Sequence, residues 1–479
     1  MSARFVLFRT TAGACIGRAT IGLVAGLCVV LGGCSNTPLP EYPVDDIPHE
    51  WRGADGSANA WPDIDWWEEF ESDELVDLIA RVKSANLDLQ NSERNMRAAE
   101  LALIDAGLDR WPAPVLSAGA SGAYAGSRSP DGDFQDGGTE SVDLSLAVDY
   151  ADILAKRPRH SAAASRYASS LARAADLRLR ILTSAASAYF QILLLRDRME
   201  AARQNLANAQ AIEGVVRARV TVGTSLASEE LRQRIVVRRQ RNEMRTLELD
   251  LLRVRASLAL LLGDSVWDSR IAGTTLADLQ VPDVGPGLPS ELLVRRPDVV
   301  QAEAALREAR ANVDLARLAF LPRIALTGGA NSTSDSLAAF LGDGTSALTV
   351  TSSMALTLFD IGRRHRNVET SRLQLQSLLA DYRRTVIAAF NEVEVTLATI
   401  DLLRSLGEVL AEDIEFAEES LRIAEARYRE GVQEFEALLG AQDTLYGARN
   451  AYLNNKLATL QASIDLYVAL GGGWRAMAR

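Results

Sequence analysis

Histidine and cysteine are the side chains that most often serve catalysis and metal binding, and this chain has three of each. The histidines, His49, His160 and His365, are scattered along 479 residues. The sequence contains no His-Glu-x-x-His zinc motif, no Gly-x-Ser-x-Gly nucleophile elbow and no glycine-rich phosphate loop. We therefore expect that the chain is not an enzyme and that it holds no cofactor and no metal.

The cysteines point to a different chemistry, the attachment of lipid. Residues 1–33 contain three arginines, no acidic residue and an apolar stretch over 21–31 that is too short to span a bilayer, as in a signal peptide. The stretch ends in Leu31-Gly32-Gly33-Cys34, which resembles the lipobox of bacterial lipoproteins. In that motif a peptidase cuts before the cysteine and its thiol is acylated. We expect lipidation at Cys34; the alternative is an ordinary signal peptide with a buried cysteine.

The composition of the mature chain narrows the class of protein. Cys15 and Cys28 leave with the signal peptide, so no disulfide framework is possible. Loss of three arginines leaves 48 basic against 63 acidic residues, a net charge of −15, which disfavours a nucleic-acid partner. Aromatic residues make up only 6%, and Ala, Leu, Arg and Glu dominate, as in long helices.

The chain is also duplicated. Leu108, Pro112, Leu116 and Gly119 recur 210 residues later as Leu318, Pro322, Leu326 and Gly329. Ala218, Arg219 and Gly223 recur 208 residues later as Ala426, Arg427 and Gly431. A repeat of roughly 200 residues is far longer than a solenoid period, so it indicates two copies of one structural unit around a pseudo-symmetric core.

Each copy contains very long helical patterns. Residues 156–220 and 363–429 lack proline after Pro158 and would each span on the order of 100 Å as helices. Gly223 and Gly431 end these helices, and we expect return helices over 226–262 and 435–470. Shorter helices are expected over 74–83 and 86–110. In the second copy Leu406, Leu410, Ile414, Ala417, Leu421, Ala424 and Tyr428 form one apolar face, whereas Glu408, Asp413, Glu415 and Glu419 lie on the outer face.

Two segments alternate instead with a period of two. Apolar and polar residues alternate over 141–150 and 348–358, with weaker partners over 116–124 and 324–330. We expect two transmembrane hairpins with polar loops over 127–140 and 331–346. The alternative is a soluble antiparallel sheet, which alternates in the same way. Four strands cannot close a membrane barrel, which needs about eight, so transmembrane hairpins require several copies of the chain. The helices would then continue the barrel as a second tube.

Several short motifs point to one family. They are Asp65-Trp66-Trp67, Asn86-Leu87-Asp88-Leu89, Leu292-Leu293-Val294-Arg295-Arg296-Pro297-Asp298-Val299, Ala302-Glu303 and Phe320-Leu321-Pro322. Together they resemble the TolC-like outer-membrane factors, in particular the NodT/OprM-like lipoproteins of RND-type efflux pumps. The resemblance implies a mainly α protein with a transmembrane β part: a trimeric 12-stranded β-barrel continuous with a periplasmic α-helical barrel. Pro297 also suits a first helical position and Asp298 a helix N-terminus, so we expect this run to serve structure.

The expected organisation follows from the repeat and the resemblance. We expect a signal peptide over 1–33, a lipidated tether over 34–60, a first outer-membrane-factor repeat over 61–270, a linker over 271–289 and a second repeat over 290–479. Each repeat would comprise a helix, a β-hairpin and a long helix pair.

The resemblance places adaptor docking and tunnel closure at the turns between the long helices. The expected docking residues are Val222, Gly223, Thr224, Ser225, Gly431, Val432 and Gln433. Relatives often carry a carboxylate before an Ala-Gln pair at the closed tip, where this chain has Gly440. We expect Glu434, Glu436 and Asp443 to form a substitute acidic constriction that favours cations. The alternative is that they solvate an exposed helix.

We therefore expect an outer-membrane, lipid-anchored channel subunit with a large periplasmic portion. Its expected partners are two further copies, a periplasmic adaptor (membrane fusion protein), an inner-membrane transporter, outer-membrane lipid and small-molecule cargo, but no nucleic acid. The alternative is a lipid-anchored periplasmic coiled-coil scaffold or adaptor without a channel. A passive duct specifies only diameter and charge, so the sequence leaves cargo, pump and adaptor open.

Overall fold

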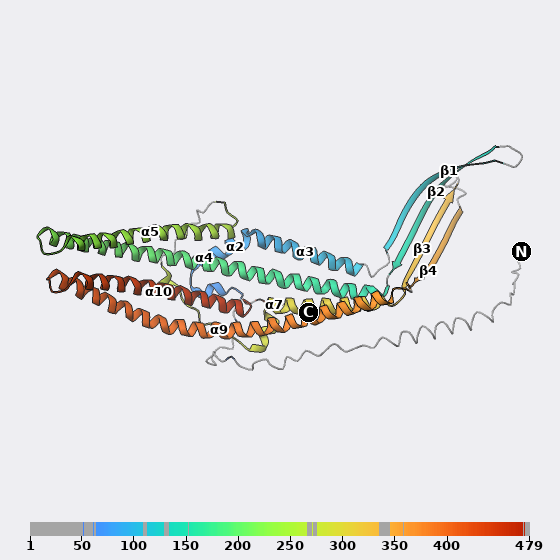
Figure 1. Cartoon of the computed structure of the whole chain (residues 1–479). Helices are drawn as coiled ribbons and strands as arrows, with labels where there is room; N and C mark the ends of the chain where they lie inside the picture. Colours follow the sequence, from blue (N-terminus) through green and yellow to red (C-terminus); the bar gives the residue numbers. More distant parts are fainter. Residues whose placement is uncertain are drawn as a thin grey trace. The chain divides into compact units, whose positions relative to one another are not determined.

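The computed structural model describes residues 51, 61, 64–108, 113–128, 134–151, 153–265, 271, 275–334, 345–357, 359–472 and 474. Cys34, the signal peptide and all of the expected tether except Trp51 lie outside these residues. Figure 1 shows the described elements, which are long helices and one β-sheet. Among the described residues, no helix is both long and apolar enough to cross a membrane.

The helices confirm the predicted pattern closely. The two longest are α4 (Lys156–Thr221) and α9 (Ile361–Arg429), of 66 and 69 residues, and the return helices are α5 (Ala227–Leu261) and α10 (Phe435–Ala469). The other helical elements are η1 (Trp66–Phe70), α2 (Asp73–Ala85), α3 (Leu87–Leu108), η2 (Ile153–Ala155), η3 (Leu276–Asp278), η4 (Pro289–Glu291), α6 (Leu292–Arg295) and α7 (Pro297–Leu318). At 1.5 Å per residue, α4 and α9 are each about 100 Å long.

The long helices pack as two antiparallel pairs. Helix α4 packs against α5, and α9 packs against α10; the two pairs meet where α10 contacts α4. Figure 1 shows the turn of each pair at the same end of the helical body. Helix α3 packs on α4, and α7 lies against both α4 and α9. Each repeat therefore contributes the same helix pair, as the duplication predicted.

An aromatic core joins the start of the folded chain to its last helix. Trp66, Phe70, Tyr189, Phe190 and Tyr467 are all at most 2% exposed, and the Trp66 ring stacks on Tyr467 with centroids 5.2 Å apart. Aromatic side chains of this size dominate core stability because they bury large apolar areas. The Asp65-Trp66-Trp67 motif thus anchors the first repeat to the end of the second.

The predicted tether is not free over its whole length. The Trp51 side chain is buried, its Nε1 donates a hydrogen bond to the Gly287 carbonyl at 3.0 Å, and its ring lies 5.9 Å from that of Phe390. The tether prediction was based on prolines and the lack of periodicity. A single large apolar residue is enough to fix the chain locally, and periodicity cannot reveal it.

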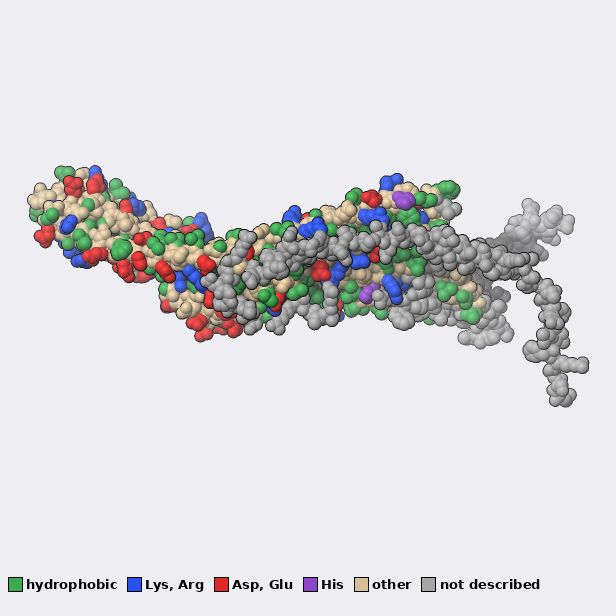
Figure 2. Space-filling model, turned by 90° about the horizontal axis from the view of Figure 1, so that it is seen from below, with side chains coloured by type: hydrophobic (Ala, Val, Ile, Leu, Met, Phe, Trp, Pro, Cys, Tyr) green, Lys and Arg blue, Asp and Glu red, His purple; other side chains and the backbone are tan. Residues whose placement is uncertain are grey.

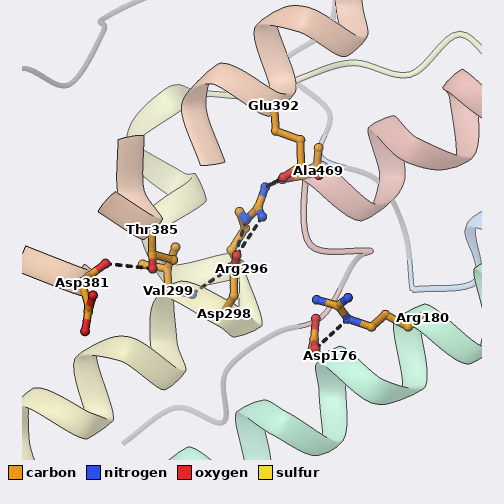
Figure 3. A network of polar contacts seen from close by, with 9 residues as sticks. All are labelled: Asp176, Arg180, Arg296, Asp298, Val299, Asp381, Thr385, Glu392 and Ala469. Carbon is orange, nitrogen blue, oxygen red and sulfur yellow. Dashed lines mark hydrogen bonds and ion pairs between the residues drawn. The ribbon is translucent and has the colours of Figure 1, made fainter. Parts of the chain in front are cut away.

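The Arg-Arg-Pro-Asp run serves structure, as predicted. Helix α7 begins at Pro297, and Arg296, with only 8% of its surface exposed, donates two hydrogen bonds to the Asp298 carboxylate at 3.0 and 2.8 Å. The same guanidinium reaches Glu392 of α9 at 2.7 Å and the Ala469 carbonyl at the end of α10 at 3.0 Å (Figure 3). Burial alone would lower the Arg296 pKa, but the two carboxylates outweigh it and the pKa is raised. The run therefore ties three helices together.

The sheet has four antiparallel strands in the order β1-β2-β3-β4. They are β1 (Ala113–Arg128), β2 (Phe134–Ala151), β3 (Arg323–Ser334) and β4 (Thr345–Ala355). The hairpins of the two repeats join through β2 and β3, where Val142 pairs with Ser334 and Ala151 with Ala325. Strands β1 and β4 are the edges of this sheet, and each pairs on one side only within the described chain.

The predicted loops were partly wrong. Most of 127–140, predicted as a loop, is strand: Ser127 pairs with Gln135, and Glu140 pairs with Gly122. Residues 331–334 and 345–346 also belong to strands, whereas β4 ends at Ala355 rather than near residue 358. Polar, glycine-rich strands show no apolar alternation, because their stability comes from the backbone hydrogen bonds of the hairpin. The alternation therefore marked the apolar part of each strand and missed the rest.

Candidate functional site at the helix-hairpin tips

The same backbone motif closes both helix pairs. At the first tip the Gly223 N–H donates to the Val220 carbonyl at 3.1 Å and the Thr224 N–H to the Arg219 carbonyl at 2.9 Å. The second tip repeats both bonds 208 residues later, from Gly431 and Val432. Gly223 and Gly431 have φ of +77° and +75°, a left-handed conformation in which a Cβ is strained. Glycine is thus required at both turns.

Arginine 219 joins the two tips. Its Nε donates to Ser225 Oγ at 3.1 Å within the first turn, and its Nη1 donates to the Tyr428 carbonyl of α9. The guanidinium also lies 4.7 Å from the centre of the Tyr428 ring. The Tyr428 hydroxyl in turn donates to Glu229 Oε2 at 3.2 Å, and burial raises the pKa of this tyrosine. These contacts hold the tips of the two repeats level with each other.

The tips expose apolar side chains. Val222 and Leu226 of the first turn and Val432 of the second are 73%, 68% and 78% exposed. Thr224 is exposed and its hydroxyl donates back to the Arg219 carbonyl at 3.1 Å, whereas Ser225 and Gln433 are half-buried. The predicted docking residues therefore lie together at the turn end of the helical body, around exposed apolar groups of the kind that protein partners cover.

Two of the three acidic gate candidates are already ion-paired within the chain. Glu436 pairs with Arg232 and Asp443 with Arg239, in each case between α10 and α5. Glu434, directly before α10, is exposed and has no ion pair among the described residues. The structure thus places a ladder of two ion pairs where the sequence suggested three free carboxylates. The arginines were missed, although they and their partners share a spacing of seven residues.

The position of the missing carboxylate has room for one. Gly440 lies within α10, and a Cβ added there would meet nothing within 4 Å. The glycine is therefore not required by packing, and in a helix it costs about 1 kcal/mol relative to alanine. Two residues on, the Gln442 side chain of α10 is fully buried, and neither end of its amide has a hydrogen-bond partner among the described residues. A buried amide without partners costs about 1–3 kcal/mol.

Comparison with known proteins gives consistent matches over nearly the whole chain. A family model described as outer membrane efflux protein matches residues 78–264 and 288–472. The chain is 31% identical to the pyoverdine export outer membrane protein OpmQ of Pseudomonas aeruginosa, over 94% of this chain and 96% of that protein. Identity to OpmQ of Pseudomonas putida is 33%, over 94% and 97%. The solved open state of the MtrE outer membrane channel of Neisseria gonorrhoeae has a TM-score of 0.81 at 26% identity, covering 91% and 98%.

Proposed function

Because this chain belongs to the outer membrane efflux protein family, we propose that three copies form the exit duct of a tripartite pump, docking a periplasmic adaptor at the helix-hairpin tips. The protein is an outer-membrane efflux channel, and such channels are trimeric and work with an adaptor and an inner-membrane transporter. Members of the family are transport channels, so no chemical step is assigned to this chain.

The four-stranded sheet is the observation that carries the proposal. Its edges, β1 and β4, each pair on one side only within the described chain. An open edge in lipid leaves backbone groups without partners at several kcal/mol each, so a membrane sheet must close. Pairing β1 of one copy with β4 of the next closes a barrel, and three copies supply twelve strands. The exposed Leu348, Val350 and Met354 of β4 are suited to face hydrocarbon.

The gate is proposed at the Arg232–Glu436 and Arg239–Asp443 ion pairs. They hold α5 against α10, and Glu434 supplies the remaining free carboxylate of the acidic constriction. Opening would separate the two helix pairs and break both bridges. We propose that the described tips are the closed state. The Gln442 amide, buried there without a described hydrogen-bond partner, makes this packing less favourable and so lowers the free energy needed to move α10.

Cys34 is proposed as the lipid-bearing first residue of the mature chain. The experiment that separates a channel from a lipid-held scaffold uses Cys34→Ala. A channel stays in the membrane pellet after a carbonate wash, because its barrel remains embedded. A scaffold held by acyl chains alone, at about 0.8 kcal/mol per buried CH₂, moves to the soluble fraction, and that result would overturn the channel.

Cargo is best tested first with pyoverdine. Two relatives at 31% and 33% identity are named for pyoverdine export. We propose that this chain exports a small molecule of that kind. Deletion of the chain should reduce the amount of this molecule in the culture medium, and the intact chain should restore it. Unchanged secretion of it, with loss of export of another small molecule, would replace this cargo and leave the duct in place.

A further inference from the structure

The tip half of one copy has two uncovered flanks. Its four long helices form a row in which α5 packs on α4, α4 on α10 and α10 on α9 (Figure 1). Helices α5 and α9 do not pack along their lengths within one described copy. A row of this kind has one face of α5 and one face of α9 free. If several copies form a ring, as the proposed duct requires, the α5 flank of one copy meets the α9 flank of the next.

Helix α9 carries a second apolar stripe besides the one that packs on α10. The packed stripe includes Ala417, Leu421 and Ala424, which are buried. The second stripe recurs every seven residues and is 40–69% exposed; it consists of Val395, Leu402, Val409, Phe416 and Ile423. An exposed apolar repeat of seven residues is the pattern of a helix that packs against a partner helix.

Free acidic side chains accompany this stripe. Figure 2 views the molecule from the α9 side and shows acidic and hydrophobic side chains over its tip half. Five acidic residues of α9 are exposed and have no ion pair with any other described residue: Asp401, Glu408, Glu412, Asp413 and Glu415. Several of them were assigned to a solvated outer face on sequence grounds. Their concentration beside an apolar stripe indicates a basic partner instead.

Helix α5 has the complementary surface. Its uncovered face exposes four apolar side chains, Leu231, Ile235, Leu249 and Leu252, at 43–66%. Between them lie four exposed arginines that have no ion pair with any other described residue: Arg234, Arg238, Arg241 and Arg245. Two other arginines of α5, Arg232 and Arg239, pair with carboxylates of α10 instead.

The two surfaces also match in height. The tip glycines, Gly223 and Gly431, lie at the same level because Arg219 joins the turns. Leu231 and Ile423 are each eight residues from their glycine, and Leu252 and Leu402 are each 29, or about 12 Å and about 44 Å along the helices. The four arginines lie 11 to 22 residues from Gly223, and Glu408 to Glu415 lie 16 to 23 from Gly431. The four arginines and four of the five acidic residues therefore fall in one band between two apolar contacts; Asp401, 30 residues from Gly431, lies just beyond it.

We propose that α5 of one copy packs antiparallel on α9 of the next, with Leu231 against Ile423, Leu252 against Leu402, and the four α5 arginines facing the acidic residues of α9. The inference rests on the proposed ring and adds the seam that sets its register and its choice of partner. Opposite charges across a helix seam specify alignment and reject mismatched partners more than they add affinity. The seam would therefore favour copies of this chain over other channels of the family.

Cysteine cross-linking tests the register. The full chain carrying Leu231→Cys and Ile423→Cys is oxidised in membranes and run on a non-reducing gel, and covalent dimers and trimers are expected. The matched control pairs Leu231→Cys with Val395→Cys, which is 36 residues from its tip glycine and should not cross-link. Cross-linking no better than the control overturns the seam. If that chain still conducts ions in a planar bilayer, the duct itself stands; if it neither conducts nor forms oligomers, the proposed function fails instead.

Charge reversal tests the pairing. Changing Arg234, Arg238, Arg241 and Arg245 to Glu should lower the fraction of trimer in native mass spectra at low salt by at least several-fold. Adding the reversal of Glu408, Glu412, Asp413 and Glu415 to Arg should restore it. The control reverses four arginines that are also exposed but are bridged within their own helices: Arg203, Arg217, Arg253 and Arg422. Equal trimer loss in control and seam variants, or no recovery in the combined variant, contradicts the proposal.

Discussion

Breaking the α5–α10 ladder should open the tips. The variant changes Arg232 and Arg239 to Gln, which removes the partners of Glu436 and Asp443 without adding bulk. The four side chains are 52–65% exposed, so each ion pair contributes about 0.2–1 kcal/mol. The two pairs are seven residues apart, or about 10 Å, and should act nearly independently. In the proposed gate, the two pairs together would stabilise the closed tips by about 0.4–2 kcal/mol, a factor of about 2 to 30 in the ratio of open to closed channels.

Single-channel recording of the purified full chain measures this ratio. The variant should spend about 2 to 30 times more time open relative to closed than the unchanged chain at low salt. The difference should shrink in 1 M salt, where the screening length falls to about 3 Å. Arg253→Gln is the control, because Arg253 pairs with Asp250 on its own helix.

A second variant guards against effects of charge alone. Exchanging the two members of one pair, Arg232→Glu with Glu436→Arg, keeps the net charge and the ion pair. This variant should therefore stay closed as the unchanged chain does, unlike the double Gln variant. An open ratio that does not change in the double Gln variant, or that rises equally in Arg253→Gln, would refute the ladder as the gate.

Three further perturbations follow from the described contacts. Arg296→Met leaves Asp298 and Glu392 without their buried partner and should destabilise the fold by about 3–5 kcal/mol, seen as a lower melting temperature in circular dichroism. The control Arg180→Met removes an exposed pair with Asp176 and should change the melting temperature little. Equal changes in the two variants would contradict the role of Arg296. Gly440→Asp should fold normally, because a Cβ there meets nothing within 4 Å, and should raise cation preference in reversal-potential measurements; a misfolded or unselective channel would count against the acidic constriction. Gln442→Leu removes a buried amide without partners and should stabilise the closed tip by about 1–3 kcal/mol, which lowers the ratio of open to closed time. A higher ratio would show that the amide gains a partner in the closed state.

Local features of the fold were predictable from the sequence. Helices α4, α5, α9 and α10 begin and end within two residues of the predicted bounds, because glycines and uninterrupted apolar periodicity mark them. Pro297 at the start of α7 was predicted from its fixed φ and missing N–H. Strand extents were not, since glycine-rich strands such as the start of β2 carry no alternation.

Long-range contacts of the site were beyond sequence reasoning. Arg219 meets the Tyr428 carbonyl 209 residues away, and Arg232 meets Glu436 at a separation of 204. Such partners are set by how the two repeats pack, and no periodicity within one helix encodes that packing. The seven-residue spacing of Arg232 and Arg239, matched by Glu436 and Asp443, was the one local signal of the ladder. The docking role of the tips stays a prediction.

Conductance of the mature chain tests the central claim most directly. Purified chain in a planar bilayer should give discrete, uniform current steps, each produced by an assembly whose mass equals three copies. Helical, correctly folded protein that inserts no conducting steps and has the mass of a single copy would contradict the duct, because one four-stranded sheet cannot enclose a pore.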